Sequence, residues 1–236
     1  GSEMCIRDRF IHDHHRKTRS GAGTHAKAVR GAELLKKHGI PFGVVAVISD
    51  VSLDHPDEIF NYFVDLGIEG VGFNIEEVEG ANESSSLAPR PEDRVREFLE
   101  CVYELNKAAG FPLKIREFEI AKENILDKYA NRGPDGTYFN LETNPLAMIS
   151  VDCFGNFSSF SPELLGQTTE DHGSFNFGNV QKQSLFELTQ ARNFQKIYDD
   201  ILAGNKKCEE TCPFWSVCGG ASPSNKYYDC LLYTSP

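Results

Sequence analysis

Three cysteines near the end of the chain have the residue type and the spacing to do chemistry. Cys208, Cys212 and Cys218 lie within eleven residues, with spacers of three and five. Thiolates on short loops that contain Pro213 and Gly219 can converge on one centre, where they would be ligands for zinc or for an iron–sulfur cluster. A tetrahedral zinc site needs a fourth protein ligand, and the neighbouring sequence offers neither a CxxC pair nor a histidine. An iron–sulfur cluster, a zinc ion and unliganded thiols all remain open.

The other cysteines do not complete a disulfide framework. The chain has seven cysteines, an odd number, and no signal peptide is visible near its start. We therefore expect a cytoplasmic protein whose thiols stay reduced. Cys101 falls inside a strong helical pattern and Cys153 lies on an expected hairpin, and both are expected to be buried structural thiols, as free cysteine commonly is.

Composition restricts the class of partner. The formal net charge is −11, from 24 Lys and Arg against 35 Asp and Glu, and no basic tract is present. This argues against nucleic acid as a partner, because phosphate binding depends on clustered basic residues. No apolar run approaches the roughly 18 residues that a membrane-spanning helix needs, so no membrane partner is expected. A cationic peptide or a small molecule is easier to accommodate.

The elements that position these residues begin with alternating helices and strands. Periodicity and capping residues predict the helices, and short runs rich in Val and Ile predict the strands. In chain order we expect a helix at 24–39, a strand at 40–49, a helix at 54–67, a strand at 71–75, a helix at 91–110, a strand at 113–120 and a helix at 121–130. This alternation predicts a parallel sheet. Since no glycine-rich phosphate loop opens any of these helices, a segment of a (β/α) barrel is favoured over a doubly wound sheet.

A second, smaller domain is expected after a connector rich in Gly, Pro and Asn. The sequence "AMISVDCFGNFSSFSPELLG" predicts a β-hairpin that turns at Gly155 and Asn156, and a helix is expected at 184–204, directly before the three cysteines. Little else in this part predicts a core. Small domains with a weak hydrophobic core usually need a disulfide or a bound metal for stability, and a metal is expected in a reducing compartment.

The motifs resemble those of a known enzyme family. "CEETCPFWSVCGGASPSNKYY", "ISVDCFGNFSSFSPELLG" and "FNFGNV" resemble the auxiliary-cluster (SPASM) domain of radical S-adenosylmethionine (radical SAM) peptide maturases. "FIHDHHRKTRSGAGTHAKAVRGAELLKKHGIPF" and "GFNIEEVEGANESSSL" resemble the later part of the barrel in the same enzymes, with the cyclophane-forming GrrM/OscB type as the nearest match. The resemblance implies an α/β fold with a partial TIM-type barrel at 10–130, a connector at 131–146 and an incomplete SPASM domain at 147–229. Residues 1–9 and 230–236 resemble translated sequencing-adapter sequence, and we interpret them as non-native, so that the chain is an internal, metagenomic fragment.

The same resemblance implies cofactors and ligands. A [4Fe-4S] cluster would bind S-adenosylmethionine, but the CxxxCxxC loop that holds this cluster in the family does not occur in this sequence. Cys208, Cys212 and Cys218 would hold an auxiliary iron–sulfur cluster. Polar residues at strand ends and in the histidine-rich segment would contact S-adenosylmethionine: Arg16, Lys27, Ser49, Asn74, Glu76 and Arg116. The histidines of "HDHH" lack the spacing of known zinc motifs and are not expected to bind a metal.

The resemblance implies an oxidoreductase of ribosomally made peptides (RiPP biosynthesis), which installs a carbon–carbon, cyclophane-type crosslink in a precursor peptide. Its electrons would come from a donor such as flavodoxin or ferredoxin. A sulfatase-maturating reaction that forms formylglycine is one alternative, and a non-catalytic, zinc-stapled peptide-binding protein is another. A further hypothesis is that the acidic residues that follow "GFNI", namely Glu76, Glu77, Glu79 and Glu83, attract a basic peptide.

Overall fold

The computed structural model describes residues 11–78, 83–87, 92–126 and 140–230. The chain divides into two compact units, each of which is described by itself. The first contains residues 1–77 and 84–120, and the second contains 78–83 and 121–236. Most of the predicted connector, at 131–146, lies outside the described residues. None of the described helices is both long enough and apolar enough to cross a membrane.

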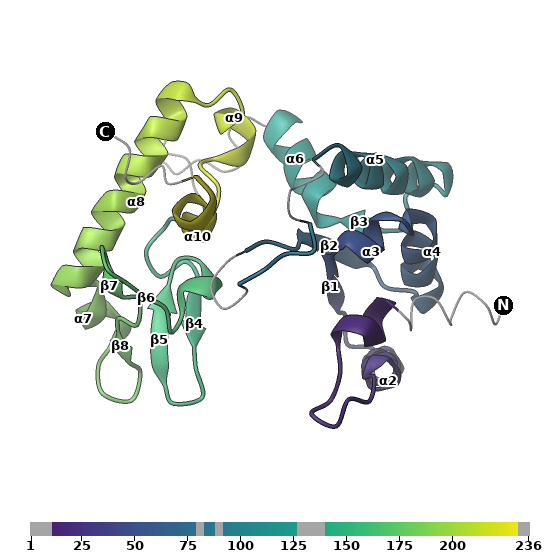
Figure 1. The fold of residues 1–236 in the computed structure, drawn as a ribbon, viewed down its shortest axis with the longest axis horizontal. Helices are drawn as coiled ribbons and strands as arrows, with labels where there is room; N and C mark the ends of the chain where they lie inside the picture. The colour runs from purple at the N-terminus through teal and green to yellow at the C-terminus, as the bar shows by residue number, and fades with distance from the viewer. Residues whose placement is uncertain (1–10, 79–82, 88–91, 127–139, 231–236) are drawn as a thin grey trace. The chain divides into compact units, whose positions relative to one another are not determined.

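The first unit is a parallel sheet with helices packed on it (Figure 1). The strands lie in the order β1-β2-β3, and both pairings are parallel, as the alternation of elements predicts. The elements are α2 (His25–Lys37), β1 (Gly43–Ile48), α3 (Asp50–Leu53), α4 (Pro56–Leu66), β2 (Gly70–Ile75), α5 (Glu92–Ala108), β3 (Lys114–Ile115) and α6 (Arg116–Leu126). The sequence did not predict α3, which is a single turn directly after β1.

One face of this sheet forms the core. Val71 and Phe73 on β2 are buried, and they pack with the buried Phe98 and Val102 of α5. The helix that periodicity predicts at 91–110 is therefore confirmed, with an apolar face toward the sheet. Cys101 lies on the same helix but is exposed, so the prediction of a buried thiol is wrong there. The helical rotation between residues 101 and 102 carries the side chain off the buried stripe.

The strand predicted at 113–120 is wrong beyond its first residues. β3 contains only Lys114 and Ile115, and the chain turns at once into α6. Glu117 and Glu119 lie in the first turn of α6, where carboxylates are favoured by the positive end of the helix dipole. Leu113 and Ile115 alternate with polar residues, and so do Phe118 and Ile120, but the two pairs are three positions apart. So short a pattern does not distinguish a strand from an amphipathic helix.

The second unit contains small antiparallel sheets beside a long helix (Figure 1). The predicted hairpin is confirmed as β4 and β5, which turn at Gly155. Gly155 has φ of +82°, which favours glycine. The elements are β4 (Ile149–Val151), β5 (Asn156–Ser159), a 3₁₀ turn (Pro162–Leu164), β6 (Thr168–Thr169), β7 (Gly173–Ser174), β8 (Gly178–Asn179), α7 (Leu185–Thr189), α8 (Arg192–Thr211), α9 (Trp215–Cys218), α10 (Pro223–Asn225) and a π-helical turn (Lys226–Cys230).

The core of the second unit is larger than the sequence suggests. Its buried members include five phenylalanines from β5, from the segments that adjoin β5, β7 and β8, and from α8, namely Phe157, Phe160, Phe175, Phe177 and Phe194. The expectation of a weakly cored domain is therefore wrong, because these aromatic residues are scattered through loop-like sequence with no helical or strand period. Cys153 follows β4 in the turn and is exposed, which contradicts the prediction of a buried thiol.

The helix predicted at 184–204 is two helices. The chain is extended at Ala191, with φ of −66° and ψ of 139°, and this residue separates α7 from α8. Helix α8 continues to Thr211, seven residues beyond the predicted end at 204. Cys208 therefore lies within a helix and not in the loop where the sequence places it.

Candidate functional site

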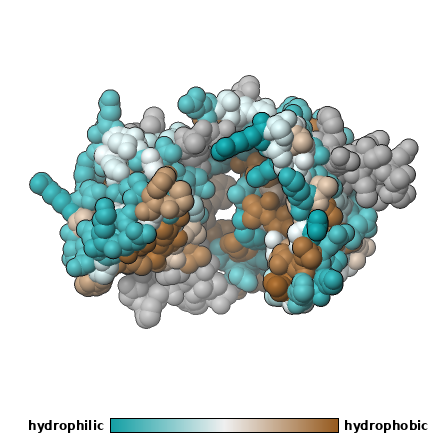
Figure 2. Space-filling model, turned by 90° about the horizontal axis from the view of Figure 1, so that it is seen from below, coloured by the Kyte–Doolittle hydropathy of each residue, from teal (hydrophilic) through white to brown (hydrophobic). Residues whose placement is uncertain are grey.

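A cavity of about 870 Å³ lies beside the edge strand β1 in the first unit. Its size is within the range of small-molecule sites. Apolar side chains from β1, α2 and α4 form most of its wall, and apolar surface is visible on this unit in Figure 2. Four of the six residues predicted to contact S-adenosylmethionine line it, namely Arg16, Lys27, Ser49 and Glu76. The structure therefore brings together residues that the sequence separates by up to sixty positions.

The polar side of the cavity is built where β1 ends. Ser49 follows the last residue of β1 and is buried, with 2% of its surface exposed. Its Oγ lies 3.2 Å from Nε2 of His15 and 3.3 Å from Oγ of Ser52. The backbone of Arg16 is fixed by Thr24, whose Oγ1 donates to the Arg16 carbonyl at 2.9 Å. A hydroxyl and a cationic side chain thus face one cavity from elements far apart in sequence.

Two further cavity residues were missed by the sequence reasoning. His25 begins α2 and Tyr62 lies on α4, and His25 Nε2 is 3.1 Å from the Tyr62 hydroxyl. The backbone N–H of His25 donates to Asp13 Oδ1 at 2.8 Å, which fixes the start of α2. The pairing depends on how α2 and α4 lie beside β1, so no local pattern in the sequence could have predicted it.

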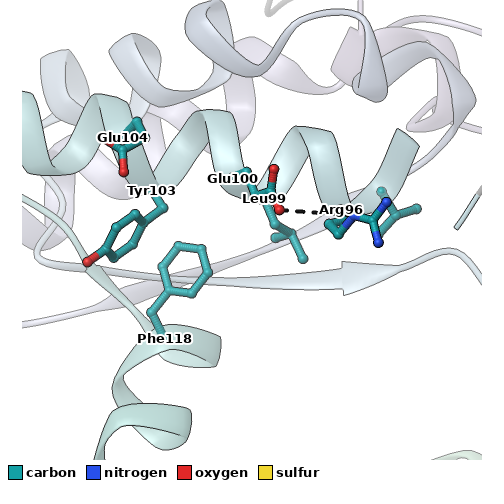
Figure 3. A pocket seen from close by; sticks show the side chains of 7 residues that line it. Arg96, Leu99, Glu100, Tyr103, Glu104 and Phe118 are labelled. Carbon is teal, nitrogen blue, oxygen red and sulfur yellow. Dashed lines mark ion pairs between the residues drawn. The ribbon is translucent and has the colours of Figure 1, made fainter. Parts of the chain in front are cut away.

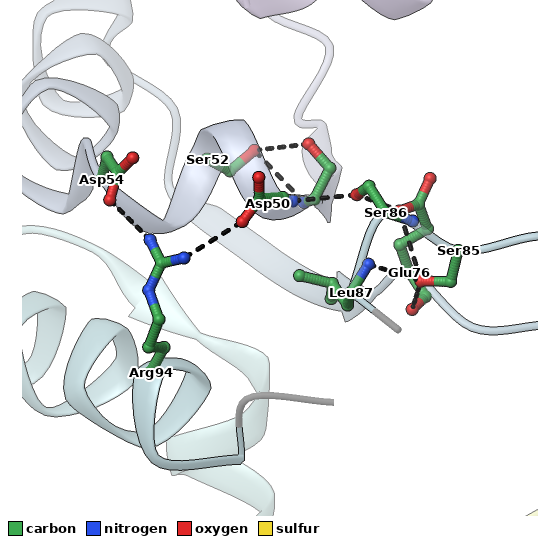
Figure 4. Close-up of polar contacts among 9 residues, drawn as sticks. Asp50, Ser52, Asp54, Glu76, Ser85, Ser86, Leu87 and Arg94 are labelled. Carbon is green, nitrogen blue, oxygen red and sulfur yellow. Dashed lines mark hydrogen bonds and ion pairs between the residues drawn. The ribbon is translucent and has the colours of Figure 1, made fainter. Parts of the chain in front are cut away.

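Glu76 lines the cavity but is engaged with the loop that follows β2 (Figure 4). Its Oε2 accepts hydrogen bonds from the backbone N–H of Ser86 at 2.7 Å and from the Ser86 hydroxyl. Ser86 Oγ also accepts from the backbone N–H of Asp50 at 3.0 Å, at the start of α3. Partial burial raises the pKa of Glu76, but the hydrogen bonds from Ser86 and Ser85 and the nearby His15 outweigh it, and the pKa is lowered. Glu76 is therefore ionised at neutral pH and holds this loop in place.

An arginine extends the same network across the surface. Arg94 of α5 donates to Asp50 at 3.0 Å and to Asp54 at 2.5 Å, so that it joins α5 to both ends of α3 (Figure 4). Leu87, at the end of the described loop segment, is buried with 2% exposure. The segment from Ser84 to Leu87 is thus attached to the first unit by an ionised carboxylate and an apolar anchor.

The remaining two predicted contacts lie elsewhere on the sheet. Asn74 and Arg116 do not line the cavity, and they bond to each other through Arg116 Nη2 and Asn74 Oδ1 at 2.7 Å. Both are exposed. The structure thus places four of the six residues at this cavity and two outside its lining, and the assignment of all six to one cofactor site stays a prediction.

The three cysteines lie near one another along the chain, at the C-terminal end of α8 and in α9. Cys208 is in α8, Cys212 caps that helix through an N–H to O=C bond of 2.8 Å with Cys208, and Cys218 ends α9. Among the residues that the structure describes, no group of three or more His, Cys, Asp or Glu side chains is arranged to hold a metal ion. The role of the three cysteines as ligands of an auxiliary iron–sulfur cluster therefore stays a prediction.

A second hollow lies on the outer surface of the first unit, between α5 and α6 (Figure 3). It has a volume of about 570 Å³ and is lined by Leu99, Tyr103 and Phe118, with Arg96 and Glu104 beside them. The rings of Tyr103 and Phe118 meet edge to face at 5.3 Å. No catalytic pair of side chains faces this hollow in the part of the chain that is described, so it is a weaker candidate than the cavity.

Comparison with known proteins gives uncharacterized relatives and sulfatase-maturating enzymes. No family model matches the chain. An uncharacterized protein of Synechocystis sp., sll1766, is 43% identical over 221 residues, which are 93% of this chain and 54% of that protein. The serine-type anaerobic sulfatase-maturating enzyme of Bacteroides thetaiotaomicron is 23% identical over 225 residues, which are 92% of this chain and 53% of that enzyme.

Solved structures of the same kind of enzyme share the fold. A polyhistidine-tagged anSMEcpe with bound AdoMet matches with a TM-score of 0.65 and 22% identity, over 90% of this chain and 53% of that one. Native anSMEcpe with bound AdoMet and the Cp18Cys peptide matches with a TM-score of 0.61 and 21% identity, over 90% and 56%. The chain is thus a distant homologue of the anaerobic sulfatase-maturating radical SAM enzymes, and it shares the fold of the part of them that it matches. It spans about half the length of the relatives that it matches.

Proposed function

We propose that this chain is the part of a radical SAM enzyme that holds S-adenosylmethionine in the cavity beside β1 and that binds a peptide or protein substrate. The observation that carries the proposal is that Arg16, Lys27 and Ser49 line one cavity in a chain whose fold matches enzymes with bound AdoMet. Fold alone does not define function. The proposal therefore depends on the chemistry of these side chains.

The cavity has the chemistry that an amphipathic nucleoside needs. Bound S-adenosylmethionine, with a reduced [4Fe-4S] cluster, supplies a radical that abstracts a hydrogen atom from the substrate. In the chain itself, Arg16 and Lys27 would bind the methionyl carboxylate at the mouth of the cavity. Ser49 would hydrogen-bond a ribose hydroxyl, and the apolar wall formed by β1, α2 and α4 would pack on the adenine.

The substrate reaction has two candidates. The relatives named as sulfatase-maturating enzymes support oxidation of a Ser or Cys side chain to formylglycine. Conversion of a serine removes two hydrogen atoms from CH₂OH and leaves an aldehyde. The radical would accept one hydrogen atom, the second hydrogen would leave as a proton to solvent, and the remaining electron would pass to an auxiliary iron–sulfur cluster. The sequence stretches that resemble cyclophane-forming maturases support the second candidate, in which the same loss forms a carbon–carbon crosslink to an aromatic ring. The comparisons favour the first candidate over the second.

The two candidates differ in a product that can be trapped. Both reactions on a serine or an aromatic pair lower the peptide mass by two hydrogen atoms, but only formylglycine reacts with a hydrazine. A hydrazone in the product of a full-length enzyme that contains this chain would support the formylglycine reaction. A product that resists hydrazine and gives a cyclic fragment in tandem mass spectra would support the crosslink.

The proposed cofactor site can be tested with this chain alone. Equilibrium dialysis with labelled S-adenosylmethionine should detect binding, and Arg16→Gln and Lys27→Gln should each weaken it by roughly tenfold, the loss of a hydrogen bond to a charged group. Lys37→Gln is the matched control, because Lys37 also lies on α2 but not on the cavity. Equal binding by all four proteins would contradict the proposed site.

A further inference from the structure

The sheet of the first unit leaves one face open. In the parallel register, Val45 pairs with Gly72 and Val47 pairs with Asn74, so these residues share a face. Val45 is 58% exposed and Val47 is 47% exposed. Strands of parallel sheets are usually covered on both faces. The neighbouring positions on the other face, including Val71 and Phe73, are already buried under helices.

Arg116 lies flat on this open face because Gly72 has no side chain. A Cβ added at Gly72 would lie 2.7 Å from Cζ of Arg116 and 2.9 Å from its Nε and Nη1. The guanidinium therefore occupies the space that any other residue at position 72 would fill. This places its donors beside Asn74, at the carboxyl ends of the strands.

Asn74, Arg116 and Glu117 form a hydrogen-bonded cluster in which two N–H donors remain available and the charges of Arg116 and Glu117 balance. Arg116 donates from Nε to Glu117 Oε1 at 2.8 Å and from Nη2 to Asn74 Oδ1 at 2.7 Å. Glu117 Oε1 is held in turn by the backbone N–H of Phe73 at 3.1 Å. Among the described residues, neither Arg116 Nη1 nor Asn74 Nδ2 has a hydrogen-bond partner. The open face thus offers two N–H donors next to an apolar stripe, without a net charge.

These properties select a ligand of one class. A carboxylate would gain little from Arg116, because Glu117 already neutralises the guanidinium. An ammonium group would gain little as well, because Asn74 Oδ1 and Glu117 Oε1 are already bonded to Arg116 and Glu117 Oε2 is buried. A neutral carbonyl oxygen accepts from both donors at no electrostatic cost. An apolar group attached near that carbonyl would cover Val45 and Val47, which lie beside Gly72 and Asn74 in the register. An extended peptide with an apolar side chain has this combination at every second residue.

We infer that Asn74 and Arg116 bind a backbone carbonyl of the substrate peptide and that the Val45 and Val47 stripe receives an adjacent apolar side chain. The inference rests on the proposed function and deepens it, because it places the peptide at Asn74 and Arg116, next to the cofactor cavity that Val45 and Val47 also line. It also reassigns Asn74 and Arg116, which the sequence placed with the cofactor.

A titration of the full chain with a blocked amino acid tests the inference. In ¹⁵N spectra, N-acetyl-L-phenylalanine amide should shift the Gly72 amide, the Asn74 side-chain amide and the Arg116 Nε–H. N-acetyl-L-phenylalanine, an acid, and L-phenylalanine amide, a cation, should bind at least threefold more weakly. Asn74→Asp keeps an acceptor for Arg116 but removes the free donor, and it should weaken binding by roughly three- to tenfold. Arg96→Gln, which changes an exposed arginine of α5, should not change it.

The outcomes separate this inference from the proposed function. If Asn74→Asp disturbs the spectrum of α5, Asn74→Ser serves as the test variant in its place, because it also lacks the side-chain amide. Equal binding of the amide by the Asn74 variant, or tighter binding of the acid, would overturn the peptide site. S-adenosylmethionine added to the same samples should shift Ala28 and Tyr62, which line the cavity. If S-adenosylmethionine shifts these signals while N-acetyl-L-phenylalanine amide leaves the Gly72 signal unchanged, the inference fails and the proposed function stands. If S-adenosylmethionine shifts Gly72 and Asn74 instead, the peptide site fails and these residues return to the cofactor.

Discussion

Replacing Glu76 by Gln removes one negative charge from the loop after β2 and leaves the side chain the same size. The carboxylate accepts from the Ser86 N–H at 2.7 Å and from the Ser86 hydroxyl, and Ser86 Oγ accepts from the Asp50 N–H at 3.0 Å. A hydrogen bond to a charged group is stronger than a neutral one by about 1 kcal/mol, which is a factor of about five in an opening equilibrium. We expect the backbone N–H groups of Ser86 and Asp50 to exchange with solvent about fivefold faster in the variant at neutral pH.

The pH dependence of this effect has a definite sign. The pKa of Glu76 is lowered from its ordinary value of 4.5. A carboxylate with a lowered folded-state pKa stabilises the fold above its unfolded-state pKa, and this contribution is lost as the pH falls through the folded-state pKa. The difference between the parent and the variant should therefore be full at neutral pH, shrink below 4.5 and vanish once Glu76 is protonated.

Native-state hydrogen exchange, measured residue by residue, is the assay. Glu69→Gln is the control, because Glu69 is an exposed acid in the same unit, just before the other end of β2. It should leave exchange at Ser86 and Asp50 unchanged. Parent-like exchange in Glu76→Gln at neutral pH, or a difference that grows as the pH falls, would refute the assignment of Glu76 as the residue that holds the loop.

Three further outcomes are expected. In denaturant titrations, Phe194→Ala should lower the free energy of unfolding of the second unit by about 3–5 kcal/mol, because Phe194 is 1% exposed and packs on Phe160 and Phe177. Phe186 is 74% exposed, and Phe186→Ala should change this free energy by no more than about 0.5 kcal/mol. After anaerobic reconstitution, Cys208→Ala, Cys212→Ala and Cys218→Ala should each lose bound iron while Cys101→Ala retains it, and unchanged iron in all three would show that they are ordinary thiols. The chain as given should release no 5′-deoxyadenosine from S-adenosylmethionine, because it has no CxxxCxxC motif, and detection of that product would contradict this.

The sequence predicts the first unit well where periodicity is strong. The helices that became α2, α4 and α5 and the strands that became β1 and β2 follow from apolar spacing and capping residues. It fails at Arg116, where a short alternating pattern ends after β3 and the chain enters α6. Side-chain pairs across elements, such as His25 with Tyr62, depend on tertiary packing and leave no local signal.

The site was predicted in part for similar reasons. Ser49 and Glu76 could be found because polar residues at the carboxyl ends of parallel strands gather at one edge of a sheet. Their partners could not, since the hydrogen bonds of Glu76 to Ser86 depend on how the loop folds back. The hypothesis that Glu76 belongs to a peptide-attracting acidic rim is weakened, because its carboxylate is already occupied. Glu79 lies outside the described residues.

Photolabelling tests the central claim most directly, because it locates the ligand as well as detecting it. A photoreactive azidoadenine analogue of S-adenosylmethionine would be irradiated with the full chain, and the labelled peptides would be mapped by mass spectrometry. The account predicts label on the cavity wall formed by α2, β1 and α4, suppressed by excess S-adenosylmethionine and reduced in Arg16→Gln but not in Lys37→Gln. Label that excess S-adenosylmethionine does not suppress, or suppressible label confined to the second unit, would contradict it.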